Sequence, residues 1–170
     1  YGKTAVMQAH SIGMHMMRKE IAAALKEVME SRIEHIYYKS EATLPFMSSD
    51  DMNGFLLGGS NDNIAMENGL KFRVDWLKGQ KTGFFVDQRE NRLLLEQYAK
   101  DKRVLNMFCY TGGFSFYALR GGAALVHSVD SSAKAIELTN ENVALNFPND
   151  ARHQAFCEDA FRFLEGADNY

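Results

Sequence analysis

Residues 103–130, RVLNMFCYTGGFSFYALRGGAALVHSVD, decide how this chain folds. An apolar run at 104–108 breaks into the turn Thr-Gly-Gly at 111–113, a helix-like run follows, and a second apolar run ends on Asp130. The order is strand, glycine turn, helix, strand, carboxylate. It predicts a βαβ unit of a parallel sheet.

A unit of this kind predicts a ligand site at the carboxyl ends of its strands. Glycines there let the backbone approach a ligand closely, and the amides of the following helix N-terminus point toward it. Asp130, at the tip of the second strand, can accept hydrogen bonds from both hydroxyls of a ribose. The unit therefore predicts a pocket for a nucleoside cofactor.

The glycine spacing separates two classes of cofactor. A dinucleotide site needs G-x-G-x-x-G to seat a pyrophosphate, whereas this turn supplies the adjacent pair Gly112 and Gly113. S-adenosylmethionine carries no phosphate, so its site needs close backbone approach without a phosphate cradle. The turn favours the methyl donor over NAD.

Residues 106–115, NMFCYTGGFS, resemble the first cofactor motif of class I methyltransferases. The variant is the one carried by the ribosomal-RNA large-subunit methyltransferase I family, which makes 5-methylcytosine. In the commoner class I pattern Asn106 would be an acid, and Phe108 and Tyr110 would be glycines. A second segment, KTGFFVDQRENR at 81–92, resembles the same family.

The resemblance implies S-adenosyl-L-methionine as the cofactor and four segments that contact it. The implied contacts are Lys81, Phe85, Gln88, Arg89, Asn106, Phe108, Cys109, Tyr110, Thr111, Gly112, Asp130, Ser131, Glu158, Asp159 and Ala160. Arg89 is expected to meet the methionine carboxylate, because a guanidinium binds a carboxylate bidentately; a solvated helix residue is the alternative. Asp159 is expected to face the adenine amino group with Phe161 beside the ring, or to serve as a helix cap.

The chemistry of the family requires a cysteine that this chain does not supply in the expected place. Cytosine C5 is a weak nucleophile, so a thiolate is expected to add to C6 first. Neither that cysteine nor an acidic-Pro-Pro loop occurs between Ala160 and Tyr170. Cys109 is expected to be a structural thiol, with nucleophile as the alternative, and Cys157 a core residue. The catalytic residues are expected after Tyr170, and residues 1–170 alone are expected to be inactive.

The chain is expected to be an α/β protein in three parts. A small α+β domain covers 1–68, a β-hairpin covers 69–88, and 89–170 form the truncated N-terminal part of a Rossmann-like domain. In the first part, helical spacing predicts a helix over 11–29, and runs on both sides of 58–62 predict a hairpin. In the second part, alternating apolar residues predict a strand over 70–77, with a return strand over 82–86. Asp87 and Glu90 form a capping-box pattern for the helix that begins the third part.

Composition and charge restrict the class of protein. A formal net charge of -3 argues against a freestanding nucleic-acid-binding domain. Ribosomal RNA is therefore expected as the substrate of a longer protein. The family's N-terminal PUA module is not matched, and the chain begins without methionine, so we expect a fragment. No apolar run is long enough to span a bilayer and no signal peptide is evident, which favours the cytoplasm.

Three further expectations concern metals, partners and alternative functions. Methionines at 7, 14, 16 and 17 with His10 and His15 are expected to fill a helical core rather than bind a metal. An open half-sheet exposes a strand edge, so pairing into a homodimer is plausible. The alternatives for function are a methyltransferase acting on another RNA base, a small molecule or a protein, and a noncatalytic nucleoside-binding module.

Overall fold

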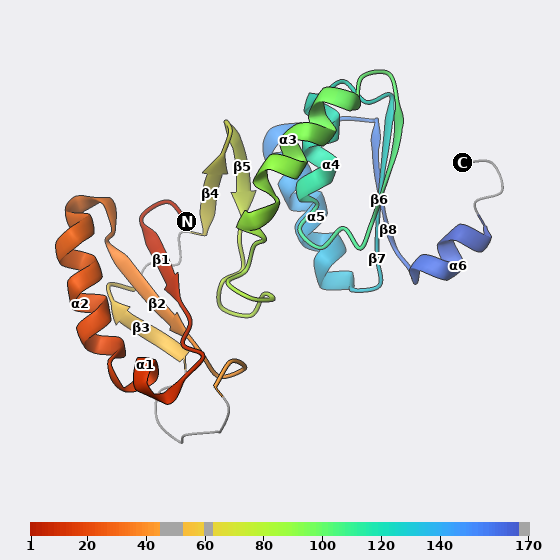
Figure 1. Ribbon diagram of the computed structural model, residues 1–170. Helices are drawn as coiled ribbons and strands as arrows, with labels where there is room; N and C mark the ends of the chain where they lie inside the picture. Colours follow the sequence, from red (N-terminus) through yellow and green to blue (C-terminus); the bar gives the residue numbers. More distant parts are fainter. Residues whose placement is uncertain (45–52, 60–62, 167–170) are drawn as a thin grey trace. The chain divides into compact units, whose positions relative to one another are not determined.

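The computed structural model describes residues 1–44, 53–59 and 63–166. The chain divides into two compact units, and Figure 1 shows the helices and strands of each. The first unit is Tyr1–Met66 with Val74–Phe84, and the second is Glu67–Arg73 with Phe85–Tyr170. The segment expected as one hairpin over 69–88 is thus shared between the two units.

The first unit contains a three-stranded sheet with a helix packed on it. Strands β1 (Thr4–Met7) and β2 (His35–Lys39) are parallel, and β3 (Asn53–Leu57) pairs with β2 antiparallel, in the order β1-β2-β3. Helix α2 (Arg18–Met29) buries Ala22 against Ile33 and Ile36, with Leu25, Met29 and Leu56 packed around them. This apolar stripe at helical spacing is the reason the helix lies on the sheet.

The helix predicted over 11–29 is two helices. Helix α1 (Ile12–Met16) is capped by Ser11, whose Oγ accepts from Met14 N at 3.4 Å. The chain bends at Met17 before α2, and a short 3-10 turn, η1 (Glu30–Arg32), follows. The expectation that the methionines fill a core is wrong for Met14, Met16 and Met17, which are 52%, 68% and 56% exposed. Met14 and Met16 belong to the short helix α1, Met17 follows it, and His15 is the buried residue of this helix.

The structure has a hairpin at 64–73, between the two positions at which hairpins were expected. Strands β4 (Ile64–Glu67) and β5 (Leu70–Arg73) pair across Asn68 and Gly69, whose φ angles are 50° and 81°. Asn-Gly with two positive φ angles is the turn that matches strand twist best. It therefore overrides the hairpin predicted around 58–62, where β3 pairs with β2 instead; residues 60–62 lie outside the described residues.

The strand predicted over 70–77 ends at Arg73, and its predicted return strand is not formed. Val74, Trp76 and Phe84 are nevertheless 0%, 2% and 6% exposed. These apolar residues are buried in a packed loop of the first unit. Their spacing therefore indicates burial, but it does not indicate a β-strand. The next element is a 3-10 turn, η2 (Val86–Gln88).

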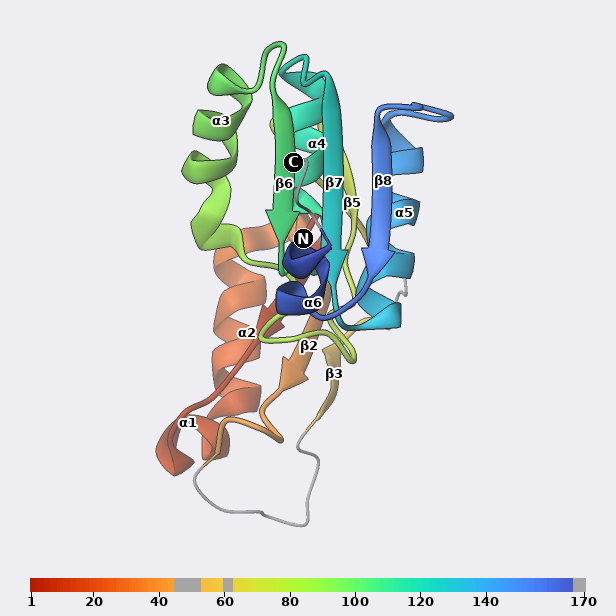
Figure 2. The ribbon, with the colours of Figure 1, turned by 90° about the vertical axis from the view of Figure 1, so that its right-hand side faces the viewer.

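The second unit is built on a parallel sheet in the order β6-β7-β8. Strands β6 (Arg103–Met107), β7 (Leu125–Asp130) and β8 (His153–Cys157) alternate with α4 (Gly113–Arg120) and α5 (Ala133–Asn146). Figure 2 shows the three strands running in one direction, with α4 and α5 on one face and α6 (Ala160–Glu165) beyond the strand ends. The predicted α/β fold with a half-wound parallel sheet is confirmed.

Helix α3 (Arg89–Tyr98) precedes the sheet and packs on α4. The capping box predicted for it is wrong, because Asp87 lies inside the η2 turn and the N-cap position falls on Gln88, which makes no side-chain cap. Arg92 of α3 is 2% exposed and forms a two-pronged ion pair with Glu67, at 2.8 and 2.9 Å. Tyr117 of α4 donates to the same carboxylate at 2.9 Å. This cluster fixes α3, α4 and the β4–β5 turn to each other.

Candidate functional site

Three loops meet at the carboxyl edge of the parallel sheet. They follow β6, β7 and β8, and the register places Met107 beside Val129 and Asp130 beside Cys157. Because parallel strands end at the same edge, residues 22 and 27 positions apart in sequence become neighbours there, and Figure 2 shows the three strands ending at this edge. This is the edge at which wound α/β sheets bind ligands.

The loop after β6 has an unusual backbone. Phe108, Tyr110 and Gly112 have φ angles of 56°, 49° and 75°, so every second residue is left-handed. Phe108 and Tyr110 are the two positions where the commoner class I pattern has glycine. The conformation is therefore kept although the glycines are not, at a cost of about 1–2 kcal/mol for each side chain.

Helix α5 holds this loop from behind. Thr139 Oγ1 donates to the carbonyl of Tyr110 at 3.0 Å, and Asn142 Nδ2 donates to the carbonyl of Thr111 at 3.0 Å. A Cβ on Gly112 would lie 2.7 Å from Thr139 Cγ2, so the glycine is required by close approach as well as by its φ angle. The loop is thus rigid before any ligand arrives.

Asp130, at the end of β7, joins two of the loops. Its Oδ2 accepts from Tyr110 N at 3.0 Å, and its Oδ1 accepts from Ser132 N at 2.9 Å. Ser132 is also the N-cap of α5, accepting from Ala135 N at 3.3 Å. The carboxylate therefore faces the carboxyl edge with both oxygens oriented by backbone amides.

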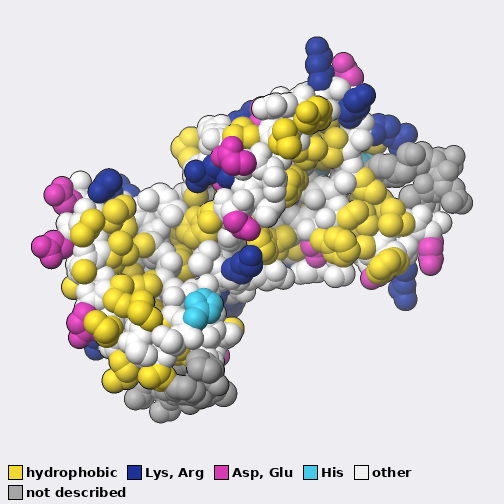
Figure 3. Space-filling model, viewed as in Figure 1, with side chains coloured by type: hydrophobic (Ala, Val, Ile, Leu, Met, Phe, Trp, Pro, Cys, Tyr) yellow, Lys and Arg dark blue, Asp and Glu magenta, His cyan; other side chains and the backbone are white. Residues whose placement is uncertain are grey.

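The loop after β8 places the third group of residues at the edge. The backbone N–H of Glu158 donates to the carbonyl of Asp130 at 3.0 Å. Asp159 Oδ1 caps α6, accepting from the amides of Phe161 and Arg162 at 3.0 and 3.2 Å. Ala160 is buried, whereas the Phe161 ring is 75% exposed and that of Phe108 74%. Figure 3 shows several groups of hydrophobic side chains on the surface of each unit.

The start of α3 contributes to the same edge. The rings of Phe85 and Tyr110 meet edge to face, with centroids 5.7 Å apart. Arg89 is 56% exposed, and its Nε lies 3.3 Å from Glu67 Oε2. Gln88 accepts from Asn91 Nδ2 at 2.9 Å. Lys81 belongs to the first unit, where its carbonyl accepts from Gln8, so Phe85, Gln88 and Arg89 are the members of this segment that share a unit with the loops.

The two cysteines differ in environment. Cys109 is 6% exposed, and burial raises the pKa of its thiol to about 11. Its Sγ lies 3.5 Å from Thr139 Oγ1. A thiol protonated at neutral pH fits a structural role. Cys157, expected in the core, is exposed because it is the last residue of a strand with no further neighbour among the described residues; its Sγ contacts the carbonyl of Ser131 at 3.7 Å.

Several residues that support the site, among them Ser115, Ser128 and His153, were not predicted, and they are joined to the predicted Asn106. Beneath the sheet, Asn106 Nδ2 donates to Ser115 Oγ at 2.8 Å, and Ser115 and Ser128 share a hydrogen bond at 2.6 Å. Ser128 Oγ lies 2.9 Å from His153 Nε2. Burial lowers the pKa of His153 to about 4, and the charge of His127 acts in the same direction. The sequence did contain a signal for these supporting residues, because polar side chains, including Thr139 and Asn142, stand at buried positions of strands and helices.

Among the described residues, no group of three or more His, Cys, Asp or Glu side chains is placed to hold a metal ion. None of the described helices is long and apolar enough to cross a membrane.

Comparison with known proteins identifies the family. The profile of the S-adenosylmethionine-dependent methyltransferase family matches residues 32–164. The chain belongs to this family. The methyltransferase chain is 39% identical over 168 residues to the ribosomal RNA large subunit methyltransferase I of Tolumonas auensis, covering 96% of this chain and 42% of that protein. The resemblance stated from the two motifs is confirmed.

Two solved structures share the fold. One is described as a SAM-dependent methyltransferase from Streptococcus mutans; it is 29% identical, with a TM-score of 0.85 over 98% of this chain and 43% of that one. Another, described as a methyltransferase complexed with SAH, has a TM-score of 0.84 and 29% identity over 98% of this chain and 42% of that one. The methyltransferase chain therefore spans less than half the length of the relatives it matches.

S-adenosylmethionine is the cofactor of the family, and the donor set at the carboxyl edge suits it. A carboxylate stands at the tip of β7, the loops after β6 and β8 each carry an exposed phenylalanine, and a second carboxylate begins α6. The edge offers no G-x-G-x-x-G cradle for a pyrophosphate. The residues present fit a nucleoside with a charged amino-acid tail.

Proposed function

We propose that this methyltransferase chain holds S-adenosylmethionine for methyl transfer to C5 of a cytosine in 23S ribosomal RNA. The observation that carries the proposal is Asp130, whose two carboxylate oxygens are oriented by Tyr110 N and Ser132 N at the end of β7. The name of the Tolumonas relative, a ribosomal RNA large subunit methyltransferase, supports the substrate.

Asp130 keeps the capacity to bind a ribose. A carboxylate offers about four lone-pair positions, and the two backbone amides occupy one on each oxygen. The remaining positions suit the 2′- and 3′-hydroxyls of the cofactor. Because the amides fix the carboxylate beforehand, little side-chain freedom is lost when the hydroxyls bind.

The other contacts follow from the same edge. The left-handed backbone at Phe108, Tyr110 and Gly112 brings main-chain groups close to the ligand. Asp159 would accept from the adenine amino group while it caps α6. Arg89 would pair with the methionine carboxylate, and its single 3.3 Å contact with Glu67 is weak enough to be exchanged. Gln88, Ser131, Glu158 and Ala160 complete the proposed lining within the second unit.

The reaction needs more than this chain provides. When bound, the cofactor supplies a methyl group activated by its sulfonium. Attack by cytosine C5 needs a thiolate at C6, and the raised pKa of the buried Cys109 thiol makes this residue unsuited to that role. We propose that the nucleophile lies after Tyr170 and that residues 1–170 bind the cofactor without transferring methyl groups.

Two experiments test the proposal separately. In calorimetry, S-adenosylhomocysteine should bind the chain and NADH should not; binding of NADH alone would contradict the cofactor assignment. The longer parent protein should then restore 5-methylcytosine in 23S ribosomal RNA from cells that lack it, measured by mass spectrometry of nucleosides. A methyl group on another base, on a protein or on a small molecule would replace the proposed substrate and leave the cofactor site intact.

Two further proposals concern where the protein acts and whether two copies of it pair. The cytoplasm is the proposed location, because ribosomal RNA is modified there. Pairing of two copies is proposed through a free strand edge, since β6 and β8 have no outer neighbour among the described residues. A noncatalytic nucleoside-binding module is the alternative if the parent protein binds the cofactor and methylates nothing.

A further inference from the structure

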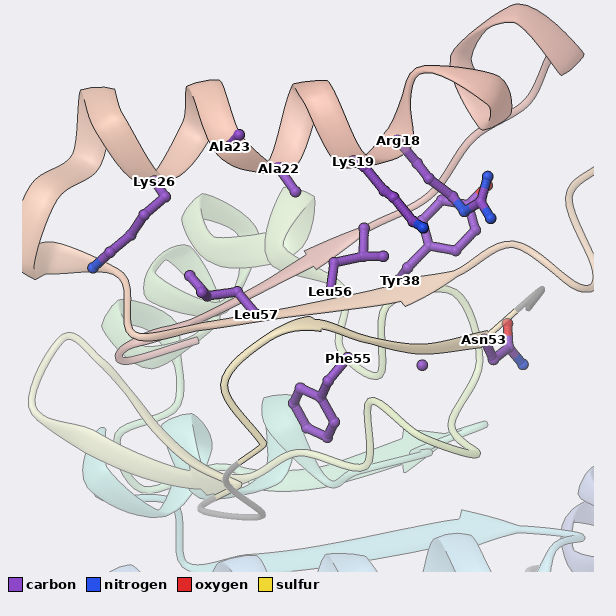
Figure 4. Close-up of a pocket in the computed structure, with 11 residues that line it drawn as sticks. Arg18, Lys19, Ala22, Ala23, Lys26, Tyr38, Asn53, Phe55, Leu56 and Leu57 are labelled. Atoms are coloured by element: carbon purple, nitrogen blue, oxygen red, sulfur yellow. The ribbon is translucent and has the colours of Figure 1, made fainter. Parts of the chain in front are cut away.

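The first unit contains a groove that the cofactor site does not use. It has a volume of about 700 Å³ and lies between α2 and the edge strand β3. Figure 4 shows Arg18 and Lys19 at one end of the groove, Lys26 at the other end, and Leu56 rising from the strand. The floor is apolar, from Ala22, Leu56 and the ring of Tyr38.

The charges of this groove have one sign. Its described lining residues include Arg18, Lys19 and Lys26 and no carboxylate. The nearby carboxylate of Glu41 is held by the amide of Asn53, with 2.9 Å between Oε2 and Nδ2. Because the whole chain carries a net charge of -3, a groove lined by three cations, with no carboxylate among its described lining residues, is a departure from the average surface. An anion is the complementary ligand.

Arg18 is prepared for such a ligand. Its Nη1 donates to the carbonyl of His15 at 3.0 Å, and its guanidinium lies 5.9 Å from the centre of the Tyr38 ring. Its Nε is buried and has no hydrogen-bond partner. Lys26 is held in place by the carbonyls of Glu30 and Ile33, at 2.8 and 2.7 Å. Lys19 is exposed and forms no ion pair with the described residues. An unsatisfied buried donor and a free ammonium lie at the same end of the groove.

We propose that this groove binds one or two nucleotides of a single-stranded segment of the substrate RNA. The phosphates would lie on Arg18 and Lys19, and a base would lie on the apolar floor. A guanidinium matches a phosphate bidentately, and unpaired bases are the parts of RNA that proteins contact with apolar and aromatic side chains. An acidic peptide would satisfy the cations but not the apolar floor. The proposal rests on the proposed function for its RNA and concerns a different unit from the cofactor site.

The test is fluorescence anisotropy with a labelled single-stranded oligoribonucleotide of about 12 nucleotides. The double variant Arg18→Ala, Lys19→Ala should weaken binding about tenfold or more and reduce the slope of log K against log salt by about 1.4, since each phosphate contact contributes about 0.7 for single strands. Lys100→Ala with Lys102→Ala is the matched control. Both are exposed cations in the second unit, before β6, and binding should change little.

A second variant fills the groove without changing charge. Ala23→Trp, at an exposed position on the lining, should weaken RNA binding while the salt slope stays near that of the wild type. Circular dichroism melts of all variants should agree with that of the wild type. Equal RNA binding by wild type, both groove variants and the control would overturn the proposal. Competition by a polyglutamate peptide as effective as that by RNA would also overturn it.

Calorimetry with S-adenosylhomocysteine on the same samples separates this proposal from the proposed function. Groove variants that lose RNA and keep the cofactor affinity support the groove. A wild-type chain that binds the cofactor and no RNA overturns the groove alone. A chain that binds RNA through the groove and does not bind the cofactor overturns the proposed function alone.

Discussion

The carboxylate of Asp130 accepts a hydrogen bond from the backbone N–H of Tyr110, with 3.0 Å between Oδ2 and N. This contact ties the end of β7 to the left-handed loop that follows β6. The same side chain that is proposed to bind the ribose therefore also shapes the loop beside it.

Asp130→Ala should weaken S-adenosylhomocysteine binding by about tenfold to a hundredfold, because hydrogen bonds to a charged group contribute about 1.5–3 kcal/mol. Asp130→Asn keeps one acceptor oxygen and should retain an intermediate affinity. Calorimetry measures both. Glu137→Ala, at an exposed acid of α5, is the control of equal charge. Cofactor binding unchanged in Asp130→Ala would remove the ribose assignment.

Gly112→Ala should lower the free energy of unfolding by about 2–4 kcal/mol, from a strained φ angle and a clash. The clash is with Thr139, whose Cγ2 would lie 2.7 Å from the new Cβ. Thr139→Ala should recover part of the loss in the double variant, since it removes the clash and not the strain. Urea unfolding of the four proteins gives the coupling energy, and strict additivity would contradict this account.

Phe108→Gly should be more stable than Phe108→Ala by about 1 kcal/mol, because only glycine adopts φ near 56° without strain. The ring is 74% exposed, so both variants lose similar packing and the comparison isolates the backbone. Thermal and urea unfolding measure the difference. An alanine variant as stable as the glycine variant would show that the left-handed conformation is not kept in solution.

Glu67→Gln should destabilise the chain by about 3–5 kcal/mol at pH 7, because it leaves the Arg92 guanidinium, 2% exposed, without its counter-charge. Glu96→Gln, which breaks the more exposed pair with Arg120, should cost about 1 kcal/mol or less. Urea unfolding provides the comparison, and equal losses in the two variants would contradict a special role for the buried pair.

The effect of Glu67 should depend on pH. Burial alone would raise the pKa of Glu67, but the hydrogen bonds and charge of Arg92, with Tyr117 and Arg89, lower it overall. A lowered folded-state pKa means that the carboxylate stabilises the fold above the unfolded-state pKa of about 4.3 and loses this effect as the pH falls through the folded-state value. The difference between wild type and Glu67→Gln should therefore shrink below about pH 4.

His153 should make the free energy of unfolding depend on pH in a higher range than Glu67 does. Its pKa of about 4 lies below the usual 6.5, so between these values the unfolded chain binds the extra proton. Stability should fall as the pH is lowered from about 6.5 to about 4, with a slope of at most about 1.4 kcal/mol per pH unit from this group. His153→Gln should flatten that part of the curve. An unchanged slope would show that His153 titrates normally.

Much of the second unit could be predicted from the sequence. The apolar runs at 104–108 and 124–129 predicted two strands, which the structure has at 103–107 and 125–130. The helices between and after them, and the position of Asp130, follow from glycine turns and caps. These signals act over a few residues, so they survive without knowledge of the fold. The adjacent pair Gly112 and Gly113 likewise favoured S-adenosylmethionine over NAD, and the resemblance of the first motif implied that cofactor.

Only the tertiary structure decided the remainder. The apolar alternation at Val74 and Trp76 predicted a strand, yet these residues are buried in a loop, because periodicity reports burial and not hydrogen bonding. The amide of Tyr110 on Asp130, Thr139 behind Gly112, and the groove between α2 and β3 join residues far apart in the chain. Sequence determined which local elements form; the packing of those elements decided which side chains meet, because contacts between distant residues depend on the folded arrangement.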